Sequence, residues 1–448
     1  MSSETTPSAP RPVSPGTARN VLIVLTFVNL FNYIDRFVVA GLTETLKNSE
    51  LHLSDTKLGL LATAFLAVYA LVSPRFGTLG DTRSRPRVIA FGVAVWSIAT
   101  ALGGFAIGFA SLFVARAFVG VGEAAYGTIA PSVLADAFPR SRRGRVFAIF
   151  YTAIPVGGAL GFLVASLMGE HWRAAFFVAG VPGLALAWLL LRLPDPPRST
   201  ADDDPVGHPP AAPGVWRHYM ALLQNRQYAF TVFGYAAYTF ALGGLSWWMV
   251  SFLERVHHVP HKDAAGQVGL IVVATGLVGT FLGGWLGDHI LRYTKHAYLL
   301  VSGVATLIAA PCAYLALTAT DPKVYLAALV VAELMIFAST GPVNSAIVNY
   351  VASGERATAM AFSILVIHAL GDVPSPYIVG ALSDARSAAL LSGIAVPSPA
   401  QIAVAESSGL QHAVLILPVA ILISGIIWTV GGLRKDEVST RRSAAGST

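Results

Sequence analysis

Long uncharged stretches recur along this 448-residue chain, and they restrict it to folds that can sit in a lipid bilayer. One runs from Val88 to Phe109 and another from Ala413 to Leu433. Each is long enough to cross a hydrocarbon core about 30 Å thick, which takes roughly 20 residues as a helix. Charged residues make up only 12% of the chain, whereas a soluble domain has about a quarter. We therefore predict an all-α membrane protein.

Charge clusters and Gly/Pro punctuation divide the chain into twelve predicted transmembrane helices. Their ranges are 20–43, 58–80, 88–109, 111–138, 145–168, 174–192, 227–253, 265–287, 297–319, 324–352, 359–383 and 412–433. A polar, proline-containing stretch with three consecutive aspartates separates helices six and seven. The predicted organisation is a disordered cytoplasmic tail (1–18), a six-helix bundle (19–193), a cytoplasmic linker (194–225), a second bundle (226–434) and a cytoplasmic tail (435–448).

The distribution of basic residues predicts the orientation, because cytoplasmic loops of membrane proteins collect Lys and Arg. With the N terminus inside, 20 of the 30 basic residues fall in inner segments and seven in outer segments. Arg36, Arg75 and Arg116 lie within predicted helices. We therefore expect a multi-pass protein of the inner (cell) membrane with both termini in the cytoplasm. This placement explains the net charge of +6 without nucleic acid as a partner.

Similar residues recur in the two halves at nearly constant offsets. Gly77-x-Leu-x-Asp81 and Gly284-x-Leu-x-Asp288 lie 207 residues apart, Glu123 and Glu333 lie 210 apart, and Pro131 and Pro342 lie 211 apart. Coincidence among Gly- and Leu-rich helices is one explanation. Duplication of a six-helix unit is the other, and such repeats build transporters whose halves rock about a site near the membrane midplane.

Several motifs carry a family likeness. Gly77-x-Leu-x-Asp81 with the following arginines resembles the signature between helices two and three of the major facilitator superfamily. The chain also contains Asn29-Leu-Phe-Asn-Tyr-Ile-Asp35-Arg36, Arg116-Ala-Phe-Val-Gly-Val-Gly-Glu123, and His368-Ala-Leu-Gly-Asp372-Val-Pro-Ser-Pro-Tyr377. Together these resemble the spinster-type branch of that superfamily, and the Ala/Gly/Arg-rich composition resembles a bacterial member.

The resemblance implies the major facilitator fold, with two six-helix halves and inverted repeats. It also implies a secondary carrier that works by alternating access and moves a lysolipid or sphingolipid, coupled to protons in at least some members. The span-five pattern Pro155-x-Gly157-Gly158-x-x-Gly161 partly resembles that of antiporters. We expect no cofactor, with a proton gradient as the energy source, and a monomer whose partners are a small amphiphilic substrate and membrane lipids.

Four charged residues in the first half are predicted to share one level of the bilayer: Asp35 and Arg36 in helix one, Arg116 and Glu123 in helix four. Intramembrane charges cost at least about 2.5–3.5 kcal/mol each, so each needs a partner or a wet cavity. The functional hypothesis is a proton-coupling network. Glu123, with no basic residue within one turn, would be the more desolvated carboxyl, and Asp35 would stay ionised beside arginines. The alternative is a permanent ion pair that only positions helices.

A second polar set lies in the other half. Glu333, His368 and Asp372, with Tyr235 and Tyr238 of helix seven, are candidates for a substrate cavity. His368 and Asp372 are four residues apart and share a helix face. Hydrogen bonding that only ties helices together is the alternative for the first three. Trp247 and Trp248 of helix seven could line the same cavity, but tryptophans near the outer end could equally form an interfacial belt.

The residues Gly77, Asp81, Arg85, Gly284 and Asp288 are candidates for a gate. The aspartates could accept hydrogen bonds from a neighbouring helix N-terminus and pair with loop arginines. The glycines would let helices pack closely there. A solvated loop charge is the alternative for the aspartates.

Other functions fit the sequence less well. The single cysteine, Cys312, has no adjacent histidine, which disfavours an intramembrane enzyme, and no cysteine pattern suggests a metal site. There is no Walker-type phosphate-binding loop for ATP and no channel filter sequence. A proton-driven exporter of drugs or small organic anions remains the alternative within transport.

Overall fold

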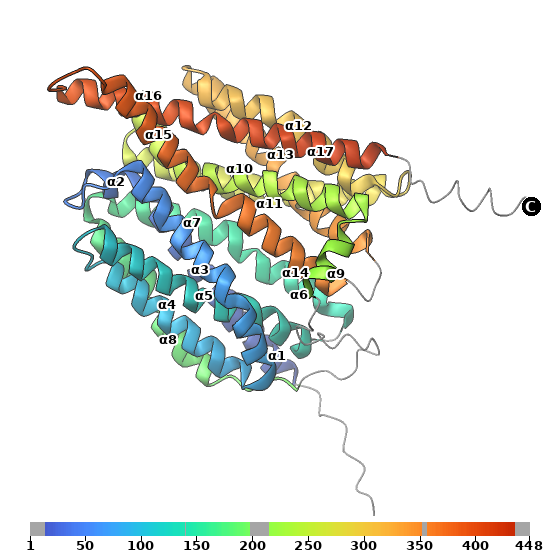
Figure 1. The fold of residues 1–448 in the computed structure, drawn as a ribbon. Helices are drawn as coiled ribbons and strands as arrows, with labels where there is room; N and C mark the ends of the chain where they lie inside the picture. The colour runs from blue at the N-terminus through green and yellow to red at the C-terminus, as the bar shows by residue number, and fades with distance from the viewer. Residues whose placement is uncertain (1–13, 139, 198–214, 352–355, 435–448) are drawn as a thin grey trace, which may run out of the picture. The chain divides into compact units, whose positions relative to one another are not determined.

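The computed structural model describes residues 14–138, 140–197, 215–351 and 356–434, and these parts are helical (Figure 1). The α-helices are α1 Pro15–Gly41, α2 Thr43–Asn48, α3 Asp55–Thr82, α4 Arg85–Gly103, α5 Phe109–Ala137, α6 Arg140–Tyr151, α7 Ala153–Met168, α8 Trp172–Leu191, α9 Val215–Leu222, α10 Arg226–His257, α11 His261–Ile290, α12 Ala297–Thr318, α13 Pro322–Asn349, α14 Arg356–Ile367, α15 Ser375–Leu391, α16 Pro399–Val414 and α17 Ile416–Leu433. A 3₁₀ turn, Gly169–His171, precedes α8, and a π-helical turn, His368–Asp372, follows α14.

Within these ranges, eleven helical segments are long and apolar enough to span a membrane. One of them, Arg145–Leu191, has 47 residues and contains both α7 and α8. At about 1.5 Å per residue it is more than twice the length that one crossing needs, so it holds two spans. The prediction of an all-α protein with twelve transmembrane helices is confirmed.

The predicted boundaries miss some helical segments. The last transmembrane run begins at Pro399 and not at residue 412, because Glu406 and several polar residues of α16 precede the uncharged stretch on which the predicted span was based. The start of α1 at Pro15 falls within the predicted disordered tail, and α9 lies within the predicted linker. The rest of those predictions, at 1–13, 198–214 and 435–448, lies outside the described residues.

Local sequence explains several helix starts. The hydroxyl of Ser14 accepts a hydrogen bond from the Thr17 backbone at 3.2 Å, and that of Ser54 accepts one from Lys57 at 3.4 Å. The carboxylate of Asp321 accepts one from Lys323 at 2.8 Å. Each replaces a partner that the first turn of a helix lacks.

The chain forms two compact units. Unit 1 contains residues 1–205, 244–273 and 375–413, and unit 2 contains 206–243, 274–374 and 414–448. In unit 1, α5 packs against α3 and α4, α1 packs against α7, and α3 packs against α15. In unit 2, α12 packs against α13 and α17. The predicted division into two six-helix bundles, 19–193 and 226–434, is based on the internal repeat and stays a prediction.

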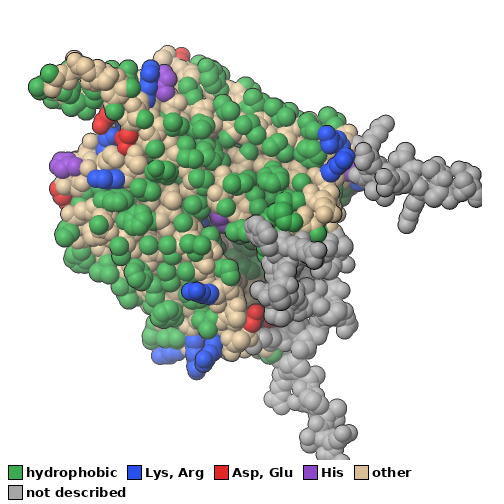
Figure 2. All heavy atoms as spheres, in the orientation of Figure 1, with side chains coloured by type: hydrophobic (Ala, Val, Ile, Leu, Met, Phe, Trp, Pro, Cys, Tyr) green, Lys and Arg blue, Asp and Glu red, His purple; other side chains and the backbone are tan. Residues whose placement is uncertain are grey.

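Large hydrophobic side chains are exposed along the helices, and Figure 2 shows them across the visible face. Phe281 is 77% exposed, Leu270 69% and Phe91 61%. Contiguous apolar surface of this kind needs a non-aqueous partner. This surface is consistent with helices that face lipid.

Candidate functional site

The four charged residues predicted for the first half do come together in unit 1. The Nε and Nη2 atoms of Arg36 both lie 2.7 Å from Oε2 of Glu123. Nη1 of Arg116 lies 3.6 Å from Oδ2 of Asp35. The side chains of Asp35 and Glu123 are 0% exposed, that of Arg116 is 2% exposed and that of Arg36 is 25% exposed. Only Arg36 therefore reaches an accessible space.

The pairing differs from the expectation in one respect. Glu123 has a basic partner from another helix, whereas Asp35 does not pair with its chain neighbour Arg36. Adjacent residues on an α-helix point about 100° apart, so Arg36 faces one carboxylate while Asp35 faces another arginine. No basic residue of α5 lies within one turn of Glu123, as the sequence indicates, and its basic partner comes from α1.

Polar atoms at this site are incompletely satisfied. Within the described chain, Oε1 of Glu123, both carboxylate oxygens of Asp35, and Nε and Nη1 of Arg116 are buried without a hydrogen-bond partner. Buried polar groups in proteins are nearly always paired, and exceptions call for an explanation. The cluster is therefore not a fully satisfied ion-pair network.

Aromatic rings surround the two arginines. The Cζ atom of Arg36 lies 5.1 Å from the ring centre of Tyr33, 4.9 Å from that of Phe65 and 5.5 Å from that of Tyr69. The Cζ atom of Arg116 lies 5.0 Å from the centre of Phe65. Guanidinium groups are attracted to such ring faces. The rings therefore provide an apolar environment that also stabilises the positive charge of Arg36.

Glycines explain how the helices bury this site. A Cβ atom at Gly120 would overlap the Phe65 carbonyl oxygen of α3, and one at Gly157 of α7 would lie 2.7 Å from the Leu30 carbonyl oxygen of α1. A Cβ atom at Gly161 would lie 2.8 Å from the Ile34 carbonyl oxygen. The predicted small face of span five thus packs against the part of α1 that carries Asp35.

In unit 2, the structure pairs His368 with Asp372. Nδ1 of His368 lies 2.9 Å from Oδ1 and 3.1 Å from Oδ2 of Asp372. The helix is wider here than the sequence predicts, since the Val373 amide donates to the His368 carbonyl five residues back at 3.3 Å. Single π turns inside α-helices are frequent at functional sites. Glycine at 371 packs against Thr239, which fits this local distortion.

The two tyrosines predicted to line a cavity pack against each other, with ring centres 5.7 Å apart. Tyr238 is 2% exposed, and its hydroxyl donates to the Ile336 carbonyl at 2.9 Å while its ring packs 5.6 Å from that of Trp428. In this structure Tyr238 is therefore part of the helix packing. The Tyr235 hydroxyl accepts a hydrogen bond from the Asn344 side chain at 3.2 Å. Glu333 is buried, 7% exposed, and interacts electrostatically with Tyr238.

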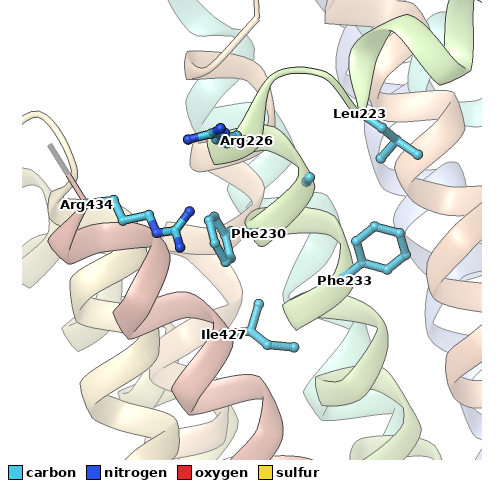
Figure 3. A pocket seen from close by; sticks show the side chains of 7 residues that line it. Leu223, Arg226, Phe230, Phe233, Ile427 and Arg434 are labelled. Carbon is cyan, nitrogen blue, oxygen red and sulfur yellow. The ribbon is translucent and has the colours of Figure 1, made fainter. Parts of the chain in front are cut away.

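A cavity of about 590 Å³ in unit 2 involves none of these predicted residues. Figure 3 shows Arg226 and Arg434 at its rim and Phe230, Phe233 and Ile427 along its side. The Cζ atom of Arg434 lies 5.3 Å from the ring centre of Phe230. The sequence did not indicate this site, because both arginines lie at helix ends, where charged side chains are ordinarily solvated.

The predicted gate residues do not make the contacts expected of them. Asp81 is exposed, and Arg85 is 3% exposed and paired elsewhere. The guanidinium of Arg85 binds the carboxylate of Asp136 and, at 2.9 Å, that of Asp195. Arg85 thus ties the end of α5 and the segment after α8 to α4 and does not hold Asp81. In unit 2, Asp288 accepts a hydrogen bond from the Tyr298 hydroxyl at 2.8 Å.

The prediction that Gly77 and Gly284 allow close packing was wrong. A Cβ atom at Gly284 would meet nothing within 4 Å, and one at Gly77 would make only an ordinary contact of 3.5 Å with Thr128. Instead, a Cβ atom at Gly283 would overlap the Ala338 carbonyl oxygen, and one at Gly80 would lie 2.8 Å from Ile129. The glycine that faces a neighbour depends on helix rotation, which the motif alone does not determine.

A second buried charge network in unit 1 was not predicted. It lies where α2 and the start of α3 meet the last turns of α10 and the middle of α15 and α16. This region is named the α2 end. Nη1 of Arg255 lies 2.7 Å from Oδ2 of Asp55, and its Nε lies 2.5 Å from Glu44. Nζ of Lys47 lies 3.0 Å from Asp55 and 3.1 Å from Glu406.

Further contacts close the α2 end. The carboxylate of Asp384 accepts hydrogen bonds from the backbone amide of Thr56 at 2.8 Å and from its hydroxyl at 2.6 Å. Ser383 donates to Asp55 at 2.6 Å. Nearby, a Cβ atom at Gly59 or Gly380 would overlap the facing backbone of α15 or α3. Apart from Lys47 and Asp55, these partners are at least 200 residues apart in the chain, so no local sequence signal identifies them.

Comparisons with known proteins agree with this architecture. The family model described as "Major Facilitator Superfamily" matches residues 25–376. Protein spinster homolog 3 of Danio rerio is 30% identical over 99% of this chain and 91% of its own length. Protein spinster of Drosophila melanogaster is 35% identical over 81% of this chain, which spans 61% of the length of that relative.

A solved structure has the same fold. It is a crystal structure of a bacterial homolog of the human lysosomal transporter Spinster in an inward-facing and unoccupied conformation. The TM-score is 0.82 at 25% identity, covering 94% of this chain and 98% of the other. The matching family model, the relatives and this fold agree with the buried charges of α1 and α5: the chain belongs to the major facilitator superfamily and, within it, to the spinster-type transporters.

Proposed function

We propose that this protein is a proton-coupled secondary active transporter for an amphiphilic, lipid-like substrate of the lysolipid or sphingolipid class. One observation carries the coupling proposal. The Glu123 carboxylate is wholly buried, with one oxygen on Arg36 and the other without a hydrogen-bond partner in the described chain. Such a carboxylate has an open position for a proton and a partner that a proton would release.

The proposed cycle uses this release. A proton that binds Glu123 neutralises the carboxylate and weakens its hold on Arg36, whose side chain is the accessible member of the cluster. Arg36 is then available to the anionic group of a substrate, while Tyr33 and Tyr69 offer apolar ring faces beside it. Loss of the proton restores the Arg36–Glu123 pair. Asp35 and Arg116 keep a second charge pair next to it.

The substrate class is inferred from the groups that lie beside Arg36. Aromatic rings beside a cation suit a molecule with an anionic head and an apolar chain. The cavity beside Arg226 and Arg434 has the same combination. A drug or small organic anion offers similar chemistry, so a proton-driven exporter of such compounds is the alternative. We further propose that the protein is a monomer in the inner membrane, an antiporter with both termini cytoplasmic and the α2 end outside.

Replacing Glu123 with glutamine should remove the pH dependence of transport. The amide keeps the shape and one hydrogen bond but cannot carry a proton between states. In proteoliposomes with an imposed pH gradient, we expect gradient-driven flux of a radiolabelled lysolipid or sphingoid phosphate to fall at least about tenfold, since a pKa mismatch of one unit already changes proton occupancy tenfold. Flux without a gradient should persist.

Asp321→Asn is the matched control, because it also turns a carboxylate into an amide and asparagine still caps α13. A Glu123→Gln protein whose flux follows the pH gradient like the parent would remove Glu123 from the coupling role. A panel with cationic drugs and organic anions, measured in the same vesicles, separates the two substrate classes.

Asp81 is proposed to act in another conformation of the cycle, since it is exposed in this one. Asp81→Asn should leave folding intact and slow transport by about tenfold or more, because a hydrogen bond to a charged group contributes about 1.5–3 kcal/mol. Initial uptake rates test this, with the neighbouring Thr82→Ala as control. A normal rate for Asp81→Asn would argue against a latch.

A further inference from the structure

His261 connects two helices at the α2 end of unit 1. Its Nδ1 atom lies 2.8 Å from Oε1 of Glu254 in α10, and its Nε2 atom lies 2.9 Å from the Ala165 carbonyl oxygen in α7. The side chains of His261 and Glu254 are 19% and 13% exposed. The imidazole thus lies between a carboxylate and a main-chain carbonyl, in a mostly buried position.

A neutral His261 next to an ionised Glu254 cannot make both of these contacts, because the pair then has one proton too few. A carbonyl oxygen only accepts, so Nε2 must carry a hydrogen. A neutral imidazole would then present a bare Nδ1 lone pair to the ionised Glu254, and two acceptors repel each other. Either Nδ1 also carries a proton or Glu254 is protonated and donates to Nδ1. In both cases the pair holds one extra proton.

The turn between α10 and α11 positions His261. His258 adopts a left-handed backbone conformation with φ 54°, and the Val259 amide donates to the Leu253 carbonyl at 3.1 Å. This hydrogen bond spans one residue more than that of a Schellman motif, and it closes the end of α10 at a left-handed position that usually holds glycine. The reversal directs His261, the first residue of α11, back to Glu254.

The α7–α11 contact is close on both sides of this histidine. The Ser166 hydroxyl donates to the Lys262 carbonyl at 2.7 Å, and a Cβ atom at Gly169 would overlap the imidazole ring. Because Nε2 of His261 bonds to α7 itself, any separation of α7 from α11 removes one of the two acceptors that require the proton.

Other charged groups surround the pair. Glu44 of α2 interacts electrostatically with both His261 and Glu254, and Arg255 of α10 interacts with Glu254. Arg255 is itself held by Glu44 and Asp55. Beyond the end of α7 come Glu170 and His171 of the 3₁₀ turn, while α11 adds Lys262 and Asp263. The nearest carboxylates favour a bound proton.

We propose that His261 and Glu254 form a second proton-binding site, which holds its proton while the α2 end is closed and loses it when α7 and α11 separate. A group that binds a proton more tightly in one conformation stabilises that conformation at low pH and ceases to do so as pH rises. Acid on the α2 side would therefore favour closure. The proposal rests on alternating access and not on proton coupling at Glu123.

Distance measurements between spin labels test this in the full-length protein in lipid nanodiscs. The native thiol is removed by Cys312→Ser, and cysteines for the labels replace Leu167 of α7 and Leu270 of α11, which are 64% and 69% exposed. For the parent we expect the ratio of short to long distances to fall with rising pH, by up to about tenfold per pH unit for one linked proton.

Two variants remove the titrating pair in different ways. Glu254→Gln should stay closed at every pH, because its amide supplies a permanent donor to Nδ1, and His261→Gln should also lose the pH dependence. Asp321→Asn, a carboxylate-to-amide control outside the site, should keep the slope of the parent, and Glu123→Gln is measured in the same labelled background. The short distance at about pH 5 shows that each variant is folded.

The results that overturn the proposal are distinct from a failure at Glu123. A parent ratio that does not vary with pH, or an unchanged slope in both His261→Gln and Glu254→Gln, rejects the second proton site. A slope that disappears in Glu123→Gln alone assigns the titration to that carboxylate. Neither result depends on transport of any substrate.

Discussion

Replacing Arg116 with methionine should destabilise the protein by about 3–5 kcal/mol, the usual cost of leaving one member of a buried ion pair without its partner. Methionine has a similar length and fills the space beside Phe65. Asp35 has no exposed surface, and without Arg116 its carboxylate would keep only the Thr100 hydroxyl beside it and would lose its ion-pair partner. A lower midpoint of thermal unfolding in detergent would report this loss.

The double variant Asp35→Asn/Arg116→Met distinguishes a functional pair from a structural one. Removing both charges should recover most of the stability, since well-packed neutral residues often replace a buried pair without loss. Transport should remain impaired if Asp35 and Arg116 take part in the cycle. Parent-like stability of the Arg116→Met protein would contradict the pairing, and normal transport by the double variant would leave the pair a purely structural role.

Gly283→Ala should disrupt the packing of α11 on α13 in unit 2, because the added methyl group would overlap the Ala338 carbonyl oxygen. Backbone cannot move aside as a flexible side chain does, so we expect a loss of at least about 1–3 kcal/mol, the usual effect of overpacking. Gly284→Ala is the matched control, since its methyl group would meet nothing within 4 Å. That variant should be as stable as the parent or gain up to about 1 kcal/mol from helix propensity.

The measurement for this pair is the midpoint of thermal unfolding together with the yield of monodisperse protein. Equal stability of the two alanine variants would show that α11 is rotated differently about its axis. The reverse order, with Gly284→Ala the less stable, would restore the packing role that the repeated glycine–aspartate motif suggests.

Much of the site could be predicted from the sequence, because placing its charged side chains within a membrane has a large free-energy cost. Asp35, Arg116 and Glu123 stand out as charges within apolar runs, and such residues must find partners in the bundle interior. The network at the α2 end gave no comparable signal. Glu44, Asp55 and Arg255 lie near helix ends, where charges are ordinarily solvated, and their burial depends on helices about 200 residues apart in the chain.

The sequence by itself determined the all-helical fold, the number of membrane spans and which charges are intramembrane, because hydropathy acts on each segment separately. Only the tertiary structure decided that Arg36 pairs with Glu123, that Gly283 and not Gly284 meets its neighbour, and that His261 bridges Glu254 and α7. Each of these depends on how a helix is rotated about its own axis and on which distant helix packs beside it. A rotation of one residue, about 100°, changes the partner completely.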